Sequence, residues 1–137
     1  KPNIVKWTDL HKGYEEAFSF VISSSDMETF AKLSGDYNPL HLDAEYSRSL
    51  GFSDCVVYGG LLVAQVSQLI GMRLPGRGAV WINMDITFRN PLLVGNIADL
   101  TAQIDDLSDA TRLIEVRFQI RTKKLRIATG SAKVMVK

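Results

Sequence analysis

Residues 61–72 read LLVAQVSQLIGM, a stretch of helical length without a charged side chain. Small or apolar residues occupy most of its helical faces: Leu61, Leu62, Ala64, Val66, Leu69 and Gly71. A helix that is apolar on most sides has to be surrounded by other elements, rather than laid on a surface. Polar residues interrupt the stretch at Gln65, Ser67 and Gln68. The stretch therefore predicts a buried helix and not a membrane span.

The chain that follows this helix has the pattern of consecutive strands. Residues 79–88 alternate, which predicts one face made of Val80, Ile82, Met84, Ile86 and Phe88. Further strands are expected at 97–107, 112–123 and 125–136. Polar turns at 108–109 and 123–124 separate them, so the three segments predict a meander.

The chain before the helix predicts one strand and two short helices. Residues 14–23 alternate, with Phe18, Phe20 and Ile22 on one face. Ser25 and Glu28 have the spacing of a capping box and should open a helix that ends at Gly35. Residues 36–42 should be irregular, because Pro39 disfavours helical geometry in the residue before it. Asp43 should cap a second short helix that stops near Gly51.

These elements predict the α+β class, with a curved antiparallel sheet wrapped around the central helix in a single hot-dog domain over residues 1–137.

The chain is 46% hydrophobic and 23% charged, with a formal net charge of +1. That balance gives no reason to expect nucleic acid or a membrane as partner. One cysteine and two histidines exclude an internal disulfide and make a poor metal set. No signal peptide is visible, and we expect a reducing, cytoplasmic compartment.

Residues 30–41, FAKLSGDYNPLH, place a carboxylate and an imidazole on irregular backbone. Such a pair, Asp36 and His41, can hold a water and move protons at a neighbouring carbon. Asn38 and Pro39 would stiffen the intervening loop and fix the direction of His41. The plainer alternative is that Asp36 caps a turn and His41 is a solvated loop histidine.

This stretch resembles the hydratase signature of the MaoC-like family, the (R)-specific enoyl-CoA hydratases. The resemblance continues through 57–61 (VYGGL), 74–78 (LPGRG) and 88–92 (FRNPL). It implies that Asp36 and His41 are the catalytic pair and that Ser67 lines the site. It also implies that the amide of Gly59 receives the thioester carbonyl. The resemblance departs at Tyr58, where many relatives have histidine, so the acyl preference is affected more than the reaction.

Two of these roles have simpler alternatives. Gly59 and Gly60 precede the apolar helix, where bare amides can stabilise a developing oxyanion. A paired glycine also serves as a hinge or as a tight contact between helix and sheet. For Ser67 the alternative is a hydroxyl that bonds the carbonyl four residues back, as is common in helices. Trp7 and Trp81 are expected to serve packing or a subunit interface.

The resemblance predicts a hydratase or dehydratase that adds water to trans-2-enoyl thioesters or removes it in the reverse reaction. The (R)-3-hydroxyacyl thioester is the product of hydration and the substrate of dehydration. No metal or organic cofactor is expected. An acyl-CoA or acyl-carrier-protein thioester is the expected substrate, and a homodimer or larger homo-oligomer the expected assembly. The candidates for binding its phosphates or an acidic carrier, with scattered surface charge as the alternative for most of them, are Arg73, Arg77, Arg89, Lys123, Lys124 and Arg126. The alternatives are a hot-dog thioesterase and a non-catalytic acyl-binding subunit, since fold alone does not separate them.

Overall fold

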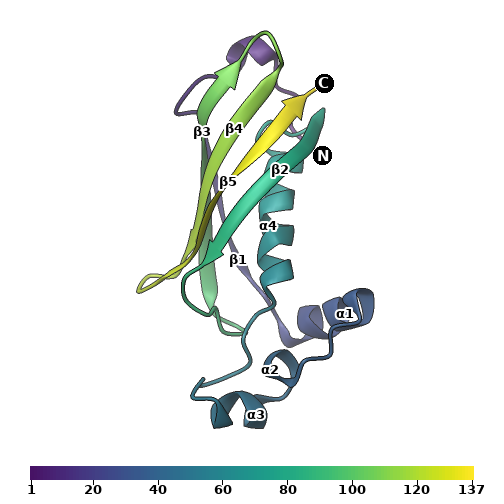
Figure 1. The fold of residues 1–137 in the computed structure, drawn as a ribbon, viewed down its shortest axis with the longest axis vertical. Coiled ribbons are helices and arrows are strands. Elements are labelled where there is room, and N and C mark those ends of the chain that lie inside the picture. Colours follow the sequence, from purple (N-terminus) through teal and green to yellow (C-terminus); the bar gives the residue numbers. More distant parts are fainter.

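The computed structural model describes residues 1–137 and contains one antiparallel sheet of five strands in the order β1-β3-β4-β5-β2 (Figure 1). The first half of the chain contains η1 (Trp7–Asp9), β1 (Glu15–Val21), α1 (Ser24–Ser34), α2 (Pro39–Leu42), α3 (Ala44–Ser49) and α4 (Gly59–Met72). The second half contains β2 (Ala79–Phe88), β3 (Ile97–Ser108), β4 (Leu113–Arg121) and β5 (Arg126–Val136). The predicted α+β hot-dog class is confirmed.

The core lies between α4 and the sheet that curves along it (Figure 1). Alternate residues of β3, β4 and β5 point toward the helix and are buried, as period-two strands require. From α4, the buried residues are Leu62, Val66, Leu69 and Ile70. The prediction that α4 is surrounded is wrong for one of its faces, because Ala64, Ser67 and Gln68 are exposed.

The strand β2 differs from its predicted face pattern. Its pairing with β5 shifts register between Trp81 and Asn83, so the inward and outward positions exchange there. Val80 and Ile82 are consequently exposed, whereas Met84 and Ile86 pack against the core as predicted. The irregularity lets Trp81 pack inward instead, which the alternation of apolar residues alone did not indicate.

Helix α1 begins earlier than predicted. The capping box is formed by Ser23 and Asp26, not by Ser25 and Glu28. The earlier cap allows Ser24 and Ser25 to join the first turn, and it places a carboxylate at the positive end of the helix dipole. The predicted end of the helix is confirmed, since Gly35 adopts a left-handed conformation with φ of 77°.

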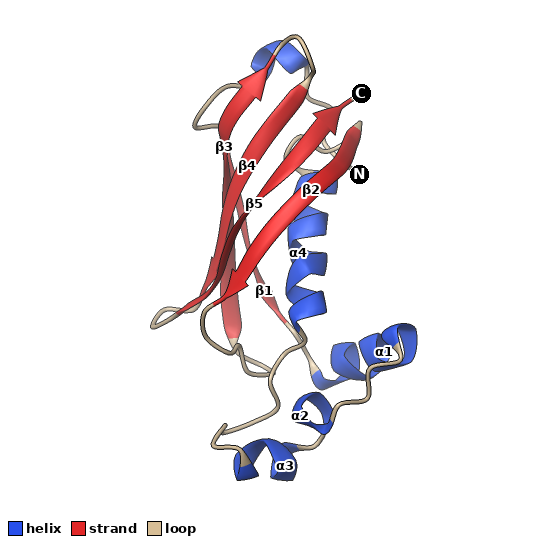
Figure 2. Cartoon of the chain, in the orientation of Figure 1, coloured by secondary structure: helices blue, strands red, loops and turns tan.

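The three short helices form a separate layer beyond one end of the sheet (Figure 2). The prediction of an irregular segment at 36–42 is wrong in part, because α2 occupies its second half as a single turn. Pro39 stands at the first helical position, where its missing N–H costs nothing. Asp43 caps α3 through the amide of Tyr46, as predicted.

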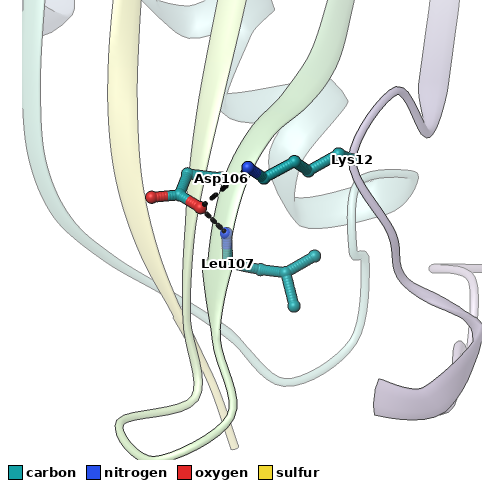
Figure 3. Close-up of polar contacts among 3 residues, drawn as sticks. All are labelled: Lys12, Asp106 and Leu107. Atoms are coloured by element: carbon teal, nitrogen blue, oxygen red, sulfur yellow. Dashed lines mark hydrogen bonds and ion pairs between the residues drawn. The ribbon is translucent and has the colours of Figure 1, made fainter.

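The opposite end of the sheet is held by exposed polar contacts. Lys12 Nζ lies 3.7 Å from Asp106 Oδ1, and the same oxygen accepts the Leu107 amide at 2.9 Å (Figure 3). Nearby, Trp7 donates to Asp109 and packs under the guanidinium of Arg112. Exposed ion pairs of this kind contribute about 1 kcal/mol or less.

No helix of the structure has the length and apolar character needed to cross a membrane.

Candidate active site

The loop that carries Asp36 is ordered by hydrogen bonds from its own neighbours. The Asp36 amide donates to Ser34 Oγ at 3.1 Å, and Asp36 Oδ1 accepts the Asn38 amide at 3.0 Å. The Asn38 side chain in turn accepts the Leu40 amide and caps α2. Asp36 therefore does cap a turn, as the plainer alternative proposed, and Asn38 orders the loop through local hydrogen bonds.

His41 is not a solvated loop histidine. Its ring is partly buried, and Nδ1 lies 2.6 Å from the carbonyl oxygen of Val56. A carbonyl oxygen can only accept, so Nδ1 carries the proton of this hydrogen bond. In the neutral ring the lone pair is then on Nε2. The fold thus fixes which nitrogen of His41 is available to exchange a proton.

Tyr58 lies between these two residues and is itself 2% exposed. Its ring stacks on His41 with a centroid distance of 3.9 Å and an interplanar angle of 26°. Its hydroxyl donates to the backbone carbonyl of Asp36 at 2.5 Å. Burial raises the pKa of Tyr58, and electrostatic interaction with Asp36 and, to a smaller degree, with Tyr37 adds to the effect. The hydroxyl therefore remains a protonated donor well into alkaline solution.

A pocket of about 410 Å³ opens beside His41. Its lining is His41, Val56, Val57, Gly59, Leu62, Phe88, Arg89, Asn90, Pro91 and Leu92. The lining comes mainly from the start of α4, the end of β2 and the loop that follows β2. Larger hollows of about 480, 560 and 780 Å³ are present, but none of them is lined by Asp36 or His41. The smaller pocket is the one that combines an imidazole with apolar walls.

The two glycines at the start of α4 each make a close aromatic contact. A Cβ on Gly59 would lie 2.9 Å from the Phe88 ring, and one on Gly60 would lie 2.5 Å from the Phe30 ring. The alternative of a tight packing contact is thus observed. The amides of both glycines also donate no hydrogen bond within the chain. Gly59 therefore offers a free N–H at a helix N-terminus that lines the pocket.

The structure brings His41, Gly59 and Tyr58 together but leaves other predicted residues apart. Of the predicted site residues, His41 and Gly59 line the pocket, whereas the exposed Asp36 does not, and neither do Asn38, Tyr58, Gly60 and Ser67. Ser67 lies on the exposed face of α4, and its hydroxyl does not make the bond to the carbonyl four residues back that was the simpler alternative. Its role in the site stays a prediction. No group of three His, Cys, Asp or Glu side chains has the arrangement of a metal site.

Comparison with known proteins connects this geometry to a family. The model of the "MaoC like domain" family matches residues 8–124. The chain belongs to the MaoC-like family.

Named relatives of this MaoC-like chain are hydratases and dehydratases. An (R)-specific enoyl-CoA hydratase of Rhodospirillum rubrum is 30% identical over 93% of the chain and 89% of its own length. A 3-hydroxybutyryl-CoA dehydratase of Methylorubrum extorquens is 34% identical over 76% of the chain and 66% of its own length. The solved (R)-hydratase of Aeromonas caviae, described as involved in PHA biosynthesis, superposes with a TM-score of 0.90. It has 29% sequence identity, and the match covers 93% of this chain and 98% of that one.

The sequence pattern places Phe88 on the apolar face of a strand, and the family resemblance of residues 88–92 gives them no role in the site. In the structure of this MaoC-like chain, Phe88, Arg89 and Leu92 form a wall of the pocket. The exposed fraction of Phe88 is 52%, although it is a large aromatic residue on an edge strand. A bulky apolar residue next to a predicted turn at a sheet edge is the signal that could have identified this wall.

Proposed function

We propose that this MaoC-like chain is an (R)-specific hydratase or dehydratase of trans-2-enoyl thioesters, which makes it a hydro-lyase. One observation carries the proposal: His41 Nε2 is left without a proton in the neutral ring, and His41 lines an apolar pocket with the free amide of Gly59. The pocket thus combines a proton-transfer group with an oxyanion donor. An enoyl thioester requires both.

The proposed reaction adds water without any net change in the protein. In the hydration direction, the family resemblance assigns to Asp36, which does not line the pocket in this structure, the removal of a proton from a water shared with His41. The oxygen of that water bonds Cβ of the substrate. The electron pair of the double bond moves toward the thioester oxygen, where the amide of Gly59 stabilises the negative charge. A proton then returns to Cα on the same face. Asp36 and His41 act as a coupled pair, which ends in the protonation state in which it began.

The substrate carrier is proposed to be coenzyme A or an acyl carrier protein. The relatives support both, because they include CoA enzymes and a mitochondrial 3-hydroxyacyl-[acyl-carrier-protein] dehydratase of Arabidopsis thaliana. Arg89 is the predicted basic residue that lines the pocket, and its Nε donates to Thr129 on the outer sheet face. This position suits a group that leaves the pocket toward solvent.

The proposed assembly is a homodimer, and the proposed location is the cytoplasm. β2 is an edge strand whose residues Val80, Ile82 and Phe88 are exposed, so a second copy has an apolar edge to cover. Phe88 also lines the pocket, which would place the mouth of the pocket near the partner. The single unpaired Cys55 suits a reducing compartment.

The test is an assay of the pure protein with crotonyl-CoA and with longer trans-2-enoyl-CoAs, read by enoyl absorbance and by a thiol reagent. We expect absorbance to fall without release of thiol, and the product to be the (R)-3-hydroxyacyl-CoA. Release of free thiol would instead identify a thioesterase. Absence of any reaction, with enoyl-CoA binding detected by calorimetry, would leave a non-catalytic acyl-binding subunit.

A further inference from the structure

Tyr58 contacts both candidate catalytic residues but does not line the pocket. Its hydroxyl bonds the main chain of Asp36, and its ring covers one face of His41. The residues around the pocket opening do not include it, and only 2% of its surface is exposed. A substrate in this pocket would therefore not contact Tyr58, so any effect of this residue on the reaction must pass through its neighbours.

The hydrogen-bond partners of Asp36 differ in their distance from it along the sequence. Ser34 and Asn38 hold Asp36 from two residues away, so they would move with the loop if the loop moved. Tyr58 is 22 residues away in the sequence and immediately precedes α4. It is thus the one hydrogen-bond partner that ties Asp36 to the body of the protein.

The second contact of Tyr58 fixes His41 from the side. The hydrogen bond to the Val56 carbonyl restrains the imidazole along its Nδ1–H direction but leaves rotation about that direction open. The ring of Tyr58 closes that freedom by stacking at 3.9 Å. The Phe30 ring also packs against Tyr58, with its centroid 4.7 Å from that of Tyr58. The Tyr58 ring is therefore itself held in place.

We propose that Tyr58 is a positioning residue, whose hydroxyl and ring set the relative placement of the Asp36 carboxylate and the His41 imidazole. This inference rests on the proposed hydratase function. The hydroxyl and the ring have separable effects: the hydroxyl fixes the Asp36 loop, and the ring fixes the imidazole. Loss of placement by about 1 Å can reduce turnover about a hundredfold. Substrate binding should be preserved, because Tyr58 does not line the pocket.

The experiment compares Tyr58→Phe, which removes only the hydroxyl, with Tyr58→Leu, which also removes the stacked ring. For Tyr58→Phe we expect kcat to fall about tenfold to a hundredfold with KM unchanged, and a larger fall for Tyr58→Leu. Tyr46→Phe, on the exposed face of α3, is the matched control and should change neither constant. Wild-type kcat in Tyr58→Phe would overturn the proposal. A rise of KM as large as the expected fall in kcat would place Tyr58 in substrate binding, and this result would also overturn the proposal.

NMR decides the proposal even if the wild-type protein hydrates no enoyl thioester. With two histidines in the chain, the imidazole signals of His41 can be assigned by comparison with His11→Ala. We expect Tyr58→Phe to speed amide exchange at residues 35–38 and Tyr58→Leu to shift the His41 ring protons. Unchanged exchange and unchanged imidazole signals would overturn the positioning role. An inactive wild type with these changes present would reject only the hydratase function.

Discussion

The sheet with α4 and the loop of residues 35–42 are held by different forces. In the body, Leu69, Val116 and Ile120 are fully buried, and the free energy comes from apolar surface removed from water. In the loop, residues 35–39 are all exposed, and hydrogen bonds to Asp36 and Asn38 set the geometry. The difference teaches that stability and proton transfer are supported by largely different residues, with Tyr58 as the core residue that contacts the loop.

The largest difference between the effect on activity and the effect on stability is expected for variants of the candidate catalytic pair. We expect Asp36→Asn and His41→Ala each to reduce kcat about 10²- to 10⁴-fold, because each removes a proton-transfer group. Asparagine keeps an oxygen that can accept the Asn38 amide, so the loop should retain its turn. His11→Ala, at the other end of the sheet, is the control for activity. A wild-type rate in either Asp36→Asn or His41→Ala would remove that residue from the mechanism.

A cavity in the core between α4 and the sheet should reduce stability and leave activity largely unchanged. Leu69→Ala is expected to lower the free energy of unfolding by about 2–5 kcal/mol, measured by urea denaturation, since the side chain is 0% exposed. The folded fraction should keep most of its kcat. Leu33→Ala changes a leucine that is 83% exposed and should stay within about 0.5 kcal/mol of wild type. Similar losses in the two variants would contradict the buried position of Leu69.

Two glycines of α4, one packed against Phe30 and one with open space around it, allow a matched test of close packing. Gly60→Ala should cost about 1–3 kcal/mol of unfolding free energy, because the new Cβ would lie 2.5 Å from the Phe30 ring. Gly71→Ala meets no atom within 4 Å and should instead stabilise the helix by about 0.5–1 kcal/mol. Thermal unfolding of both proteins checks the opposite signs. Equal effects would show that the Phe30 contact is not tight.

The raised pKa of Tyr58 predicts a loss of stability in alkaline solution. An unfolded tyrosine releases its proton near pH 10, and the folded Tyr58 releases it only at higher pH. Between these values the unfolded state binds fewer protons, so the free energy of unfolding falls as pH rises. Below the unfolded value this contribution is fully present. Urea denaturation from pH 8 to 11 should show a smaller decline for Tyr58→Phe than for Tyr46→Phe, and equal slopes would contradict the prediction.

The smallest effect is expected at the end of the sheet farthest from the loop. Lys12→Ala removes the ion pair with Asp106, whose two side chains are 73% and 68% exposed. The unfolding free energy should change by less than about 1 kcal/mol, and added salt should reduce the difference further. A larger loss that persists in high salt would show that this end contributes more than its exposure indicates.

Local patterns predicted much of the fold because they depend on neighbours in the sequence. The alternation of Phe18, Phe20 and Ile22, the end of α1 at Gly35 and the cap at Asp43 all follow from spacing and from residue chemistry. The same reasoning chose the wrong capping box. Ser23 and Ser25 each have an acidic residue three positions later, and spacing does not rank two equal candidates.

Features that depend on pairing were not visible in the pattern. The inward position of Trp81 follows from a register shift against β5, and a strand read alone has no register. The pocket wall formed by Phe88 and Leu92 likewise depends on where β2 ends relative to α4. Family resemblance supplied Asp36, His41 and Gly59, but it did not indicate the hydrogen bond from Tyr58 to the Asp36 carbonyl.

By itself, the sequence determined the α+β class, the course of the central helix and the loop on which Asp36 and His41 lie, because helix and strand periodicity are local properties of the chain. The tertiary structure alone decided which nitrogen of His41 holds the proton, which residues enclose the pocket and how Tyr58 joins the two halves of the pair. These features require groups far apart in the sequence to come within hydrogen-bond or van der Waals distance. Such distances follow from the packing of the whole chain and not from any one segment.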